Sequence, residues 1–516
     1  MNGSEALLRT LVAGGVDVCF MNPGTSEMHV VAALDDAPEM RGVLALFEGV
    51  ATGAADGYAR IAERPAATLL HLGPGLGNGL ANLHNARRAQ SPIVNIVGDH
   101  ATGHQQYDAQ LQSDIVTVAR NVSNWIRTPQ DAIELVDDAA AAIAAASGPP
   151  GQVATVIAPA DTGWQTDAQP ATQVPPSSPT PICHRDVDAI ADVLRSGEPT
   201  ALLVGGRGCR GSALVDASRI ARGTGAKLLA ETFPARLERG AGRPEVERIA
   251  YLAEFAALQL DGLRHLILLD ARAPVSFFAY PGKASDLVPA GCTIHTLAPS
   301  DGEIAASLAA LADAVGADAP TVQAVERPSL PTGDLTADAV CRAVGALLPE
   351  GAIVSDEGNT SALFAPGHTA GAPPHDWLCL TGGSIGQGLP VAVGAAIAAP
   401  DRRVVALQAD GSAMYTLQAW WTMAREQLDV TTVLFDNSSY AVLDMELARV
   451  GARAPGARAR RMLDLSNPSI DFVALAAGLG VPASRATTCE EFNQQLGRAL
   501  ASPGPNVVVA TVPPII

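Results

Sequence analysis

Aromatic and charged residues are scarce in this chain of 516 residues. Aromatics make up 4% and charged residues 17%, against 48% hydrophobic residues. So low a charged fraction beside so much apolar material excludes a disordered chain. The few cysteines lie far apart and form neither a metal-binding spacing nor a dense disulfide framework, so we expect reduced, mostly structural thiols. They are Cys19, Cys183, Cys209, Cys292, Cys341, Cys379 and Cys489.

Long uncharged apolar runs and a secretion signal are also lacking. The alanine-rich stretch at 138–147 is too short to span a bilayer. The N-terminus carries Glu5 early and has neither the basic start nor the cleavage signature of a signal peptide. The formal net charge of −19 argues against a nucleic-acid or an anionic membrane partner. We therefore expect a cytoplasmic protein without such partners.

What is present is a repeated alternation of apolar strands and helices, which is typical of parallel sheets covered by helices. The length suggests about three domains. Proline-containing stretches at 165–181 and 317–336 look like linkers. The sequence thus predicts an α/β fold of three doubly wound parallel-sheet domains, at 1–164, 182–316 and 335–516.

The segment 404–443 places two oxygen-bearing side chains at strand ends. An apolar run ends at Asp410, a helix-compatible stretch follows, and a second apolar run ends just before Asn437. A parallel strand–helix–strand unit would bring both residues to the carboxyl edge of the sheet, where open α/β sheets bind ligands. A carboxylate and an amide oxygen suit Mg²⁺, which takes further ligands from water or from a phosphate group. The alternative is an ordinary turn with an exposed acid.

This pattern resembles the cofactor motif of the thiamine diphosphate (ThDP) enzymes, in particular the acetolactate synthase, benzoylformate decarboxylase and pyruvate oxidase group. The resemblance implies that Asp410, Asn437 and the main-chain carbonyl of Ser439 bind Mg²⁺. Two positions depart from the motif. Ala409 replaces a glycine, and Asp436 replaces an asparagine, which would set an extra carboxylate beside the metal. The resemblance covers essentially the whole chain, in the order pyrimidine-binding, central and diphosphate-binding domain.

A second shared segment runs from Phe47 to Arg60, FEGVATGAADGYAR, and resembles the family's E-x-x-A-x-x-x-A-x-G-Y-A-R stretch. The resemblance implies that Glu48 is the carboxylate that binds the aminopyrimidine ring and activates the cofactor. A shielded carboxylate suits that task because its hydrogen bond to a charged partner is strong. The alternative is an acid that stabilises a helix N-terminus.

Two further segments resemble benzoylformate decarboxylase. In Asn22-Pro23-Gly24-Thr25-Ser26-Glu27, Thr25 stands at an active-site serine and would contact the substrate carboxylate, or would only cap a helix. His71 follows an apolar strand at the position of a proton-transferring histidine. A structural histidine is the alternative. The second histidine of that enzyme would fall near Phe277, Phe278 or Ala279, and none is present here.

The segment 381–390, TGGSIGQGLP, resembles the part of the family that holds ThDP bent. Ile385 would support the bend, and the carbonyl of Gly383 would accept from the aminopyrimidine. Asn359, Gly411 and Ser412 would contact the diphosphate. Packing between domains is the alternative role for these glycines.

The residues at the predicted substrate positions do not all match one substrate class. Aligning 108–114 with an acetolactate synthase segment puts Leu111 at its glutamine, with Gln110 alongside. Val442 and Glu446 would face the pocket, where a carboxylate suggests a polar or smaller substrate unless it faces solvent.

A glycine-rich turn in the central domain, 206–211, satisfies the GxGxxG pattern of dinucleotide sites. A single match of this kind also occurs in plain packing turns. Some relatives hold a flavin or another nucleotide in this domain and others hold nothing, so we do not expect bound FAD.

Together these segments predict a ThDP- and Mg²⁺-dependent 2-oxo acid decarboxylase or carboligase, similar to benzoylformate decarboxylase. An acetolactate synthase-like transferase is the main alternative, and a non-catalytic cofactor-binding paralogue is the third. The resemblance also implies that each site is shared between subunits, so that a homodimer is the minimum and a homotetramer is expected. Fold resemblance alone does not name the 2-oxo acid.

Overall fold

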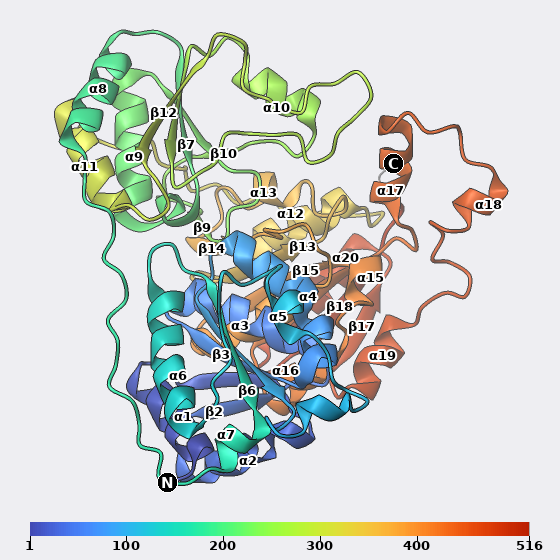
Figure 1. The fold of residues 1–516 in the computed structure, drawn as a ribbon. Helices are drawn as coiled ribbons and strands as arrows, with labels where there is room; N and C mark the ends of the chain where they lie inside the picture. The colour runs from blue at the N-terminus through green and yellow to red at the C-terminus, as the bar shows by residue number, and fades with distance from the viewer. Residues whose placement is uncertain (515–516) are drawn as a thin grey trace.

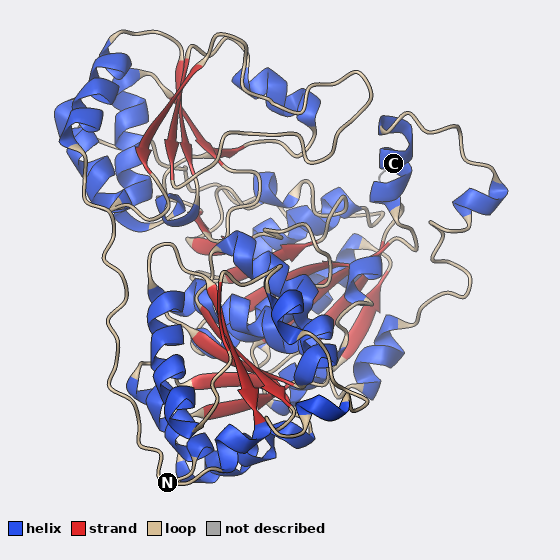
Figure 2. Cartoon of the chain, viewed as in Figure 1, coloured by secondary structure: helices blue, strands red, loops and turns tan. Residues whose placement is uncertain are grey.

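The computed structural model describes residues 1–514, and these form three sheets, each with helices packed against it (Figure 2). All pairings inside the first two sheets are parallel, and the third has one antiparallel edge. The predicted α/β fold class is confirmed. Across residues 1–514 no helix is long and apolar enough to cross a membrane.

The first sheet has six strands in the order β2-β1-β3-β4-β6-β5. Most of its strand residues are buried, because helices cover both faces of a parallel sheet. The strands are β1 (Val18–Asn22), β2 (Arg41–Leu44), β3 (Ala66–Leu70), β4 (Ile93–Asp99), β5 (Trp125–Arg127) and β6 (Val153–Pro159). The helices are α1 (Gly3–Ala13), α2 (Met28–Ala32), α3 (Glu48–Ala62), α4 (Leu72–Ala89), α5 (Ile115–Ala119), α6 (Ala132–Ser147) and α7 (Ala160–Trp164).

The second sheet has the order β10-β8-β7-β11-β12 and forms the green domain of Figure 1. The segment that connects it to the first domain, 165–181, runs along the outside of the molecule (Figure 1). The strands are β7 (Thr200–Val204), β8 (Lys227–Ala230), β10 (Glu247–Arg248), β11 (His265–Leu269) and β12 (Thr293–Ala298). The helices are α8 (His184–Arg195), α9 (Gly211–Thr224), α10 (Ala253–Leu260) and α11 (Ile304–Ala314).

The third sheet has the order β17-β18-β16-β15-β13-β14-β9. Its edge strand β9 (Leu237–Arg239) comes from the middle of the chain and pairs antiparallel with β14. The other strands are β13 (Ile353–Glu357), β14 (His375–Leu378), β15 (Val404–Ala409), β16 (Val430–Asp436), β17 (Ala483–Ala486) and β18 (Asn506–Thr511). The helices are α12 (Ala337–Leu347), α13 (Ala365–His368), α14 (Gly388–Ala398), α15 (Asp410–Ala413), α16 (Gln418–Arg425), α17 (Ala441–Arg449), α18 (Ala457–Arg460), α19 (Phe472–Gly478) and α20 (Cys489–Ala501).

Helices α3 and α14 join the first domain to the third at very short range. A side chain at Gly394 would overlap the main-chain oxygen of Ala54, and one at Gly57 would overlap that of Val391. Two glycines therefore let the helix backbones touch. This contact places the N-terminus of α3 beside the loop that precedes α14.

A buried arginine reinforces the same junction. Arg60 is 5% exposed and pairs with Asp56 one turn earlier on α3, at 2.5 Å. Its guanidinium also donates to the Cys379 carbonyl at 2.8 Å and to the Thr381 hydroxyl at 3.0 Å. The start of segment 381–390 is thereby tied to the first domain.

Candidate functional site

The carboxylate of Asp410 organises the turn at the carboxyl ends of β15 and β16. These strands are parallel neighbours, with Ala409 opposite Phe435, so their following turns meet. Asp410 is 2% exposed, and one of its oxygens accepts from the main-chain N–H groups of Asn437 at 3.1 Å and Ser438 at 2.7 Å. The two predicted strand-end residues are therefore brought together.

The Asn437 side chain fixes the next residues of the turn. Its Oδ1 accepts from the Ser439 N–H at 2.9 Å, and its Nδ2 donates to the Ser361 hydroxyl at 3.3 Å. Within residues 1–514 no three His, Cys, Asp or Glu side chains gather to hold a metal ion. A cation at this turn would therefore use the mixed set of one carboxylate, one amide oxygen and main-chain oxygens, which is the hard oxygen set that Mg²⁺ accepts.

The extra carboxylate of Asp436 is paired with an arginine. Arg485 donates to it at 2.6 Å, and the Ser438 hydroxyl donates at 3.2 Å. Burial raises the pKa of Asp410 to about 6, and the charge of Asp436 adds to the rise against the opposing main-chain hydrogen bonds. A divalent cation would relieve this cost of a buried carboxylate, so the residues present fit the metal.

The predicted diphosphate contacts surround the same turn. A side chain at Gly411 would overlap the Tyr440 ring, so the main chain is packed directly on that ring. The Ser412 hydroxyl accepts from Gln408 at 2.6 Å and donates to the Ala409 carbonyl at 3.1 Å. Asn359 is exposed just past the carboxyl end of β13, with φ of 49°. Their contacts with a diphosphate stay predictions.

Glu357 is a buried carboxylate two positions before Asn359. It is 2% exposed, and it accepts from the N–H groups of Gly386 at 2.6 Å and Gly388 at 2.7 Å and from the Gln408 amide at 3.0 Å. Burial raises its pKa to about 7 in spite of these hydrogen bonds. Glu357 thus anchors the C-terminal end of segment 381–390 to the third sheet.

The first domain holds the same segment from the opposite side. Asn85 binds both the N–H of Ser384 at 3.2 Å and its carbonyl at 2.8 Å. Asn82 donates to the carbonyls of Gly386 at 3.1 Å and Gly49 at 2.7 Å. Gly49 follows Glu48, so the loop proposed to hold the bent cofactor lies beside the start of α3. Within this loop Gly383 has φ of 73° and Ile385 is half-buried.

Glu48 and His71 lie around one glycine of α4. Glu48 begins α3, is 6% exposed and accepts from the Asn78 amide at 3.0 Å. A Cβ built at Gly75 would lie 3.2 Å from Glu48 Oε1 and 3.4 Å from His71 Cβ. The structure therefore brings the Glu48 carboxylate and the Cβ of His71 to the same glycine of α4.

Glu27 holds the His71 ring, and the sequence analysis assigned it no role. Its carboxylate is 2.8 Å from His71 Nδ1 and accepts from the Gly24 N–H at 2.7 Å and the Ser26 hydroxyl at 2.6 Å. Glu27 is 1% exposed, and a side chain at Gly24 would overlap the imidazole. The predicted residue Thr25 is exposed, whereas its neighbour Ser26 contacts His71 at 3.3 Å. The acid that ends an N-P-G-x-x-E loop was the signal for this pairing.

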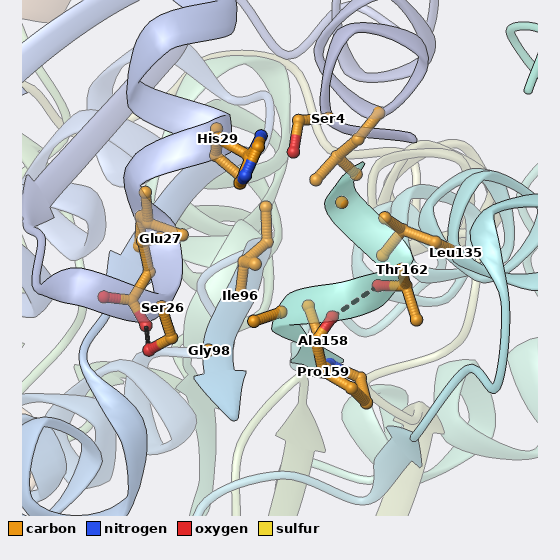
Figure 3. Close-up of a pocket in the computed structure, with 15 residues that line it drawn as sticks. Ser4, Ser26, Glu27, His29, Ile96, Gly98, Leu135, Ala158, Pro159 and Thr162 are labelled. Carbon is orange, nitrogen blue, oxygen red and sulfur yellow. Dashed lines mark hydrogen bonds between the residues drawn. The ribbon is translucent and has the colours of Figure 1, made fainter. Parts of the chain in front are cut away.

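A small cavity lies on the other side of Glu27, between α2, α7 and β4 (Figure 3). Ser26, Glu27, His29 and Thr162 are among its lining residues. Its volume of about 20 Å³ holds one water molecule and no organic substrate. This cavity is therefore not the cofactor site.

The predicted substrate positions fall in two places. Gln110 and Leu111 are exposed on the loop after β4, and this loop lies against α4, where a side chain at Gly73 would overlap Ser113. On α17, Val442 is half-buried, and Glu446 accepts from the hydroxyl of Tyr280 at 2.9 Å. The Glu446 carboxylate is thus bound by a residue of the central domain rather than left free in a pocket.

The glycine-rich turn at 206–211 has its main-chain donors bound by carboxylates of the same chain. The Gly206 N–H donates to Glu231 at 3.2 Å, and the Arg207 N–H donates to Asp270 at 2.8 Å. A side chain at Gly206 would overlap the Asp270 carboxylate. Two main-chain donors of this turn are therefore already bound by carboxylates of the chain.

Comparison with known proteins identifies the family. Residues 1–120 match the family described as thiamine pyrophosphate enzyme, N-terminal TPP binding domain, and residues 356–510 match its C-terminal TPP binding domain. A Mycobacterium tuberculosis protein named "Putative acetolactate synthase large subunit IlvX" is 60% identical over the full length of both chains. Benzoylformate decarboxylase of Pseudomonas aeruginosa is 30% identical over 96% of each chain.

A solved structure extends the likeness to the fold. It is the thiamine diphosphate-dependent 4-hydroxybenzoylformate decarboxylase of Rhodococcus jostii, which is 24% identical with a TM-score of 0.86 and covers 99% of both chains. The two matched domains and the full-length relatives together show the family. This chain therefore belongs to the thiamine pyrophosphate enzyme family.

Proposed function

We propose that this protein is a ThDP- and Mg²⁺-dependent 2-oxo acid decarboxylase or carboligase, similar to benzoylformate decarboxylase. The observation that supports the proposal is that Glu48 and the Cβ of His71 both lie against Gly75, while the buried Glu27 carboxylate binds Nδ1 of His71. A decarboxylation of this kind needs a group that activates the cofactor and a group that moves a proton near neutral pH. ThDP, when bound, supplies the electron sink for the loss of CO₂.

Each remaining residue has a holding role in this proposal. Asp410, Asn437 and the Ser439 carbonyl would hold Mg²⁺, which would supply positive charge to the diphosphate. Gly383 and Ile385 support the bent cofactor, with Gly411, Ser412 and Asn359 near its diphosphate. Thr25 and Gln110, with Leu111 and Val442, are proposed as substrate contacts.

An acetolactate synthase-like transferase is the second candidate. The printed name of the Mycobacterium tuberculosis relative favours it. Both reactions begin with the loss of CO₂ from a 2-oxo acid and differ in the acceptor, which is a proton or a second carbonyl carbon. A non-catalytic paralogue is a third and weaker candidate, since Glu48 and Asp410 are both retained.

We further propose a homodimer at minimum, with a homotetramer favoured, because the family shares each site between subunits. Domain boundaries at 164, 182, 316 and 335 fit the extended connections, although β9 of the middle segment completes the third sheet. A small 2-oxo acid is the proposed partner, in the cytoplasm, without nucleic acid or membrane. FAD is not proposed, since Glu231 and Asp270 bind the donors of the glycine-rich turn.

Release of CO₂ by purified protein from a panel of 2-oxo acids tests the proposal. We expect turnover that needs both ThDP and Mg²⁺, is lost with a chelator and returns with added Mg²⁺. An aldehyde product would indicate the decarboxylase, and a 2-hydroxy-3-oxo acid would indicate the transferase. Tight ThDP binding with no CO₂ from any member of the panel would contradict the proposal and favour the non-catalytic paralogue.

The substitution Glu27→Gln tests the orientation of His71. As a carboxylate, Glu27 accepts from Nδ1–H and leaves Nε2 free as the basic nitrogen. We expect kcat to fall by about 10- to 100-fold, the usual effect of removing such a partner.

The matched control for this substitution is Asp35→Asn, which removes an exposed acid of the same domain. A Glu27→Asp variant that regains part of kcat would support the role of the charge. Activity lost only in proportion to the loss of folded protein would show that Glu27 is merely structural.

A further inference from the structure

The central domain carries a cluster of four aromatic side chains. The ring of Phe277 lies 5.3 Å from that of Tyr251, 6.0 Å from that of Phe233 and 4.9 Å from that of Phe278. Tilted and edge-to-face arrangements at such distances are mutually attractive. The cluster gives the loop after β11 an apolar surface.

This cluster touches the segment proposed to hold the cofactor. A Cβ built at Gly383 would lie 2.5 Å from Cζ of Phe277, so the ring lies directly on the Gly383 main chain. Gly383 has φ of 73°, which L side chains rarely adopt. Phe277 therefore forms a wall of the same site, although it belongs to a different domain.

Two rings of the cluster are exposed to solvent. Phe277 is 42% exposed and Phe278 is 51% exposed. Exposed aromatic surface beside a binding site is typical of a place that a ligand covers, because burying apolar area is favourable. The exposed rings thus point to an apolar group on the ligand.

The charges around the cluster are paired. The Glu446 carboxylate accepts from Tyr280 at 2.9 Å and Tyr251 at 3.3 Å, and it lies 3.5 Å from Arg449. Arg449 also binds Glu254 at 2.9 Å and stacks on the Tyr280 ring. Because these residues bind the Glu446 carboxylate, it is not free to bind a polar substrate. Glu446 therefore gives no support to the polar or smaller substrate that the sequence suggested.

We propose that Phe277 and Phe278 determine substrate specificity and that the substrate is an aryl 2-oxo acid, whose ring lies against Phe277. This inference rests on the proposed function. A flat apolar group covers the exposed ring faces and can stack on them, whereas the methyl group of pyruvate leaves them in water. The 2-oxo acid end stays with the residues of the first domain and the cofactor.

The inference is tested by the ratio of kcat/KM for benzoylformate to kcat/KM for pyruvate. We expect wild-type protein to favour benzoylformate by about 100-fold or more, since a few carbon atoms in an apolar pocket give at least this discrimination. In Phe277→Ala the ratio should fall by about tenfold, through loss of the benzoylformate rate alone. Phe277→Leu, which keeps apolar volume without the flat ring, should fall between the two.

Phe255→Ala is the matched control, because Phe255 is a 57% exposed aromatic of the same domain outside the cluster. Its ratio should equal that of wild type. Wild-type preference for pyruvate, or an equal loss of both rates in Phe277→Ala, would overturn the inference. So would a change of oligomeric state in Phe277→Ala with an unchanged ratio, which would show that a second copy covers these rings. Absence of turnover with every 2-oxo acid would instead count against the proposed function itself.

Discussion

Glu48→Gln is expected to lower kcat by about a thousandfold, within the range seen when a positioned acid or base is removed. The carboxylate lies at the start of α3, almost fully buried, with Asn78 donating to one oxygen. A glutamine oxygen can still accept from Asn78, so the local structure should persist. What is lost is the negative charge that the proposed activation of ThDP requires.

Initial rates of CO₂ release and circular dichroism, measured on the same preparation, check this prediction. The control is Glu39→Gln, an exposed acid of the first domain, which should keep the wild-type rate. A Glu48→Gln variant with more than about a tenth of wild-type kcat would contradict the assignment, since the expected loss is far larger. ThDP binding that persists in the variant would separate loss of chemistry from loss of the site.

Gly394→Ala is expected to have the largest effect on stability. Its Cβ would overlap the Ala54 carbonyl oxygen, and neither main chain can move without separating α3 from α14. Overpacking in a well-packed interior costs about 1 to 3 kcal/mol, and backbone contact places this site at the upper end. We therefore expect about 3 kcal/mol of destabilisation, with weakened contact between the first and third domains.

Urea unfolding followed by tryptophan fluorescence measures the effect. Gly497→Ala is the matched control, since it adds the same methyl group to helix α20 with no atom within 4 Å. This control should gain about 0.5 to 1 kcal/mol, the helix preference of alanine over glycine. Equal midpoints for the two variants would show that the α3–α14 contact does not limit stability.

Local sequence signals were sufficient for most of the fold. Strand β15 and strand β16 read as apolar runs, and the turns after them placed Asp410 and Asn437 at one sheet edge, as the structure has them. Register and parallel pairing follow from the strand–helix–strand connection, which has one strongly preferred hand. The family assignment followed from these same short segments and is confirmed.

Local sequence patterns could not predict the pairings between distant segments. Strand β9 has three residues and no alternation of its own, and it becomes a strand only because β14 offers it a partner. The Ser26 contact with His71, next to exposed Thr25, depends on the turn geometry of one short loop. Periodicity cannot resolve a difference of one residue in such a turn.

By itself, the sequence determined the α/β class and the ThDP family and predicted the residues that would carry its chemistry, because those signals lie within single segments. Only the tertiary structure decided that Glu27 orients His71, that Glu446 is bound by Tyr280 and that Phe277 covers Gly383. Each of these contacts joins segments at least 44 positions apart in the chain. Such contacts form only when segments far apart in the chain pack together, so the periodicity of a single segment does not specify the partner.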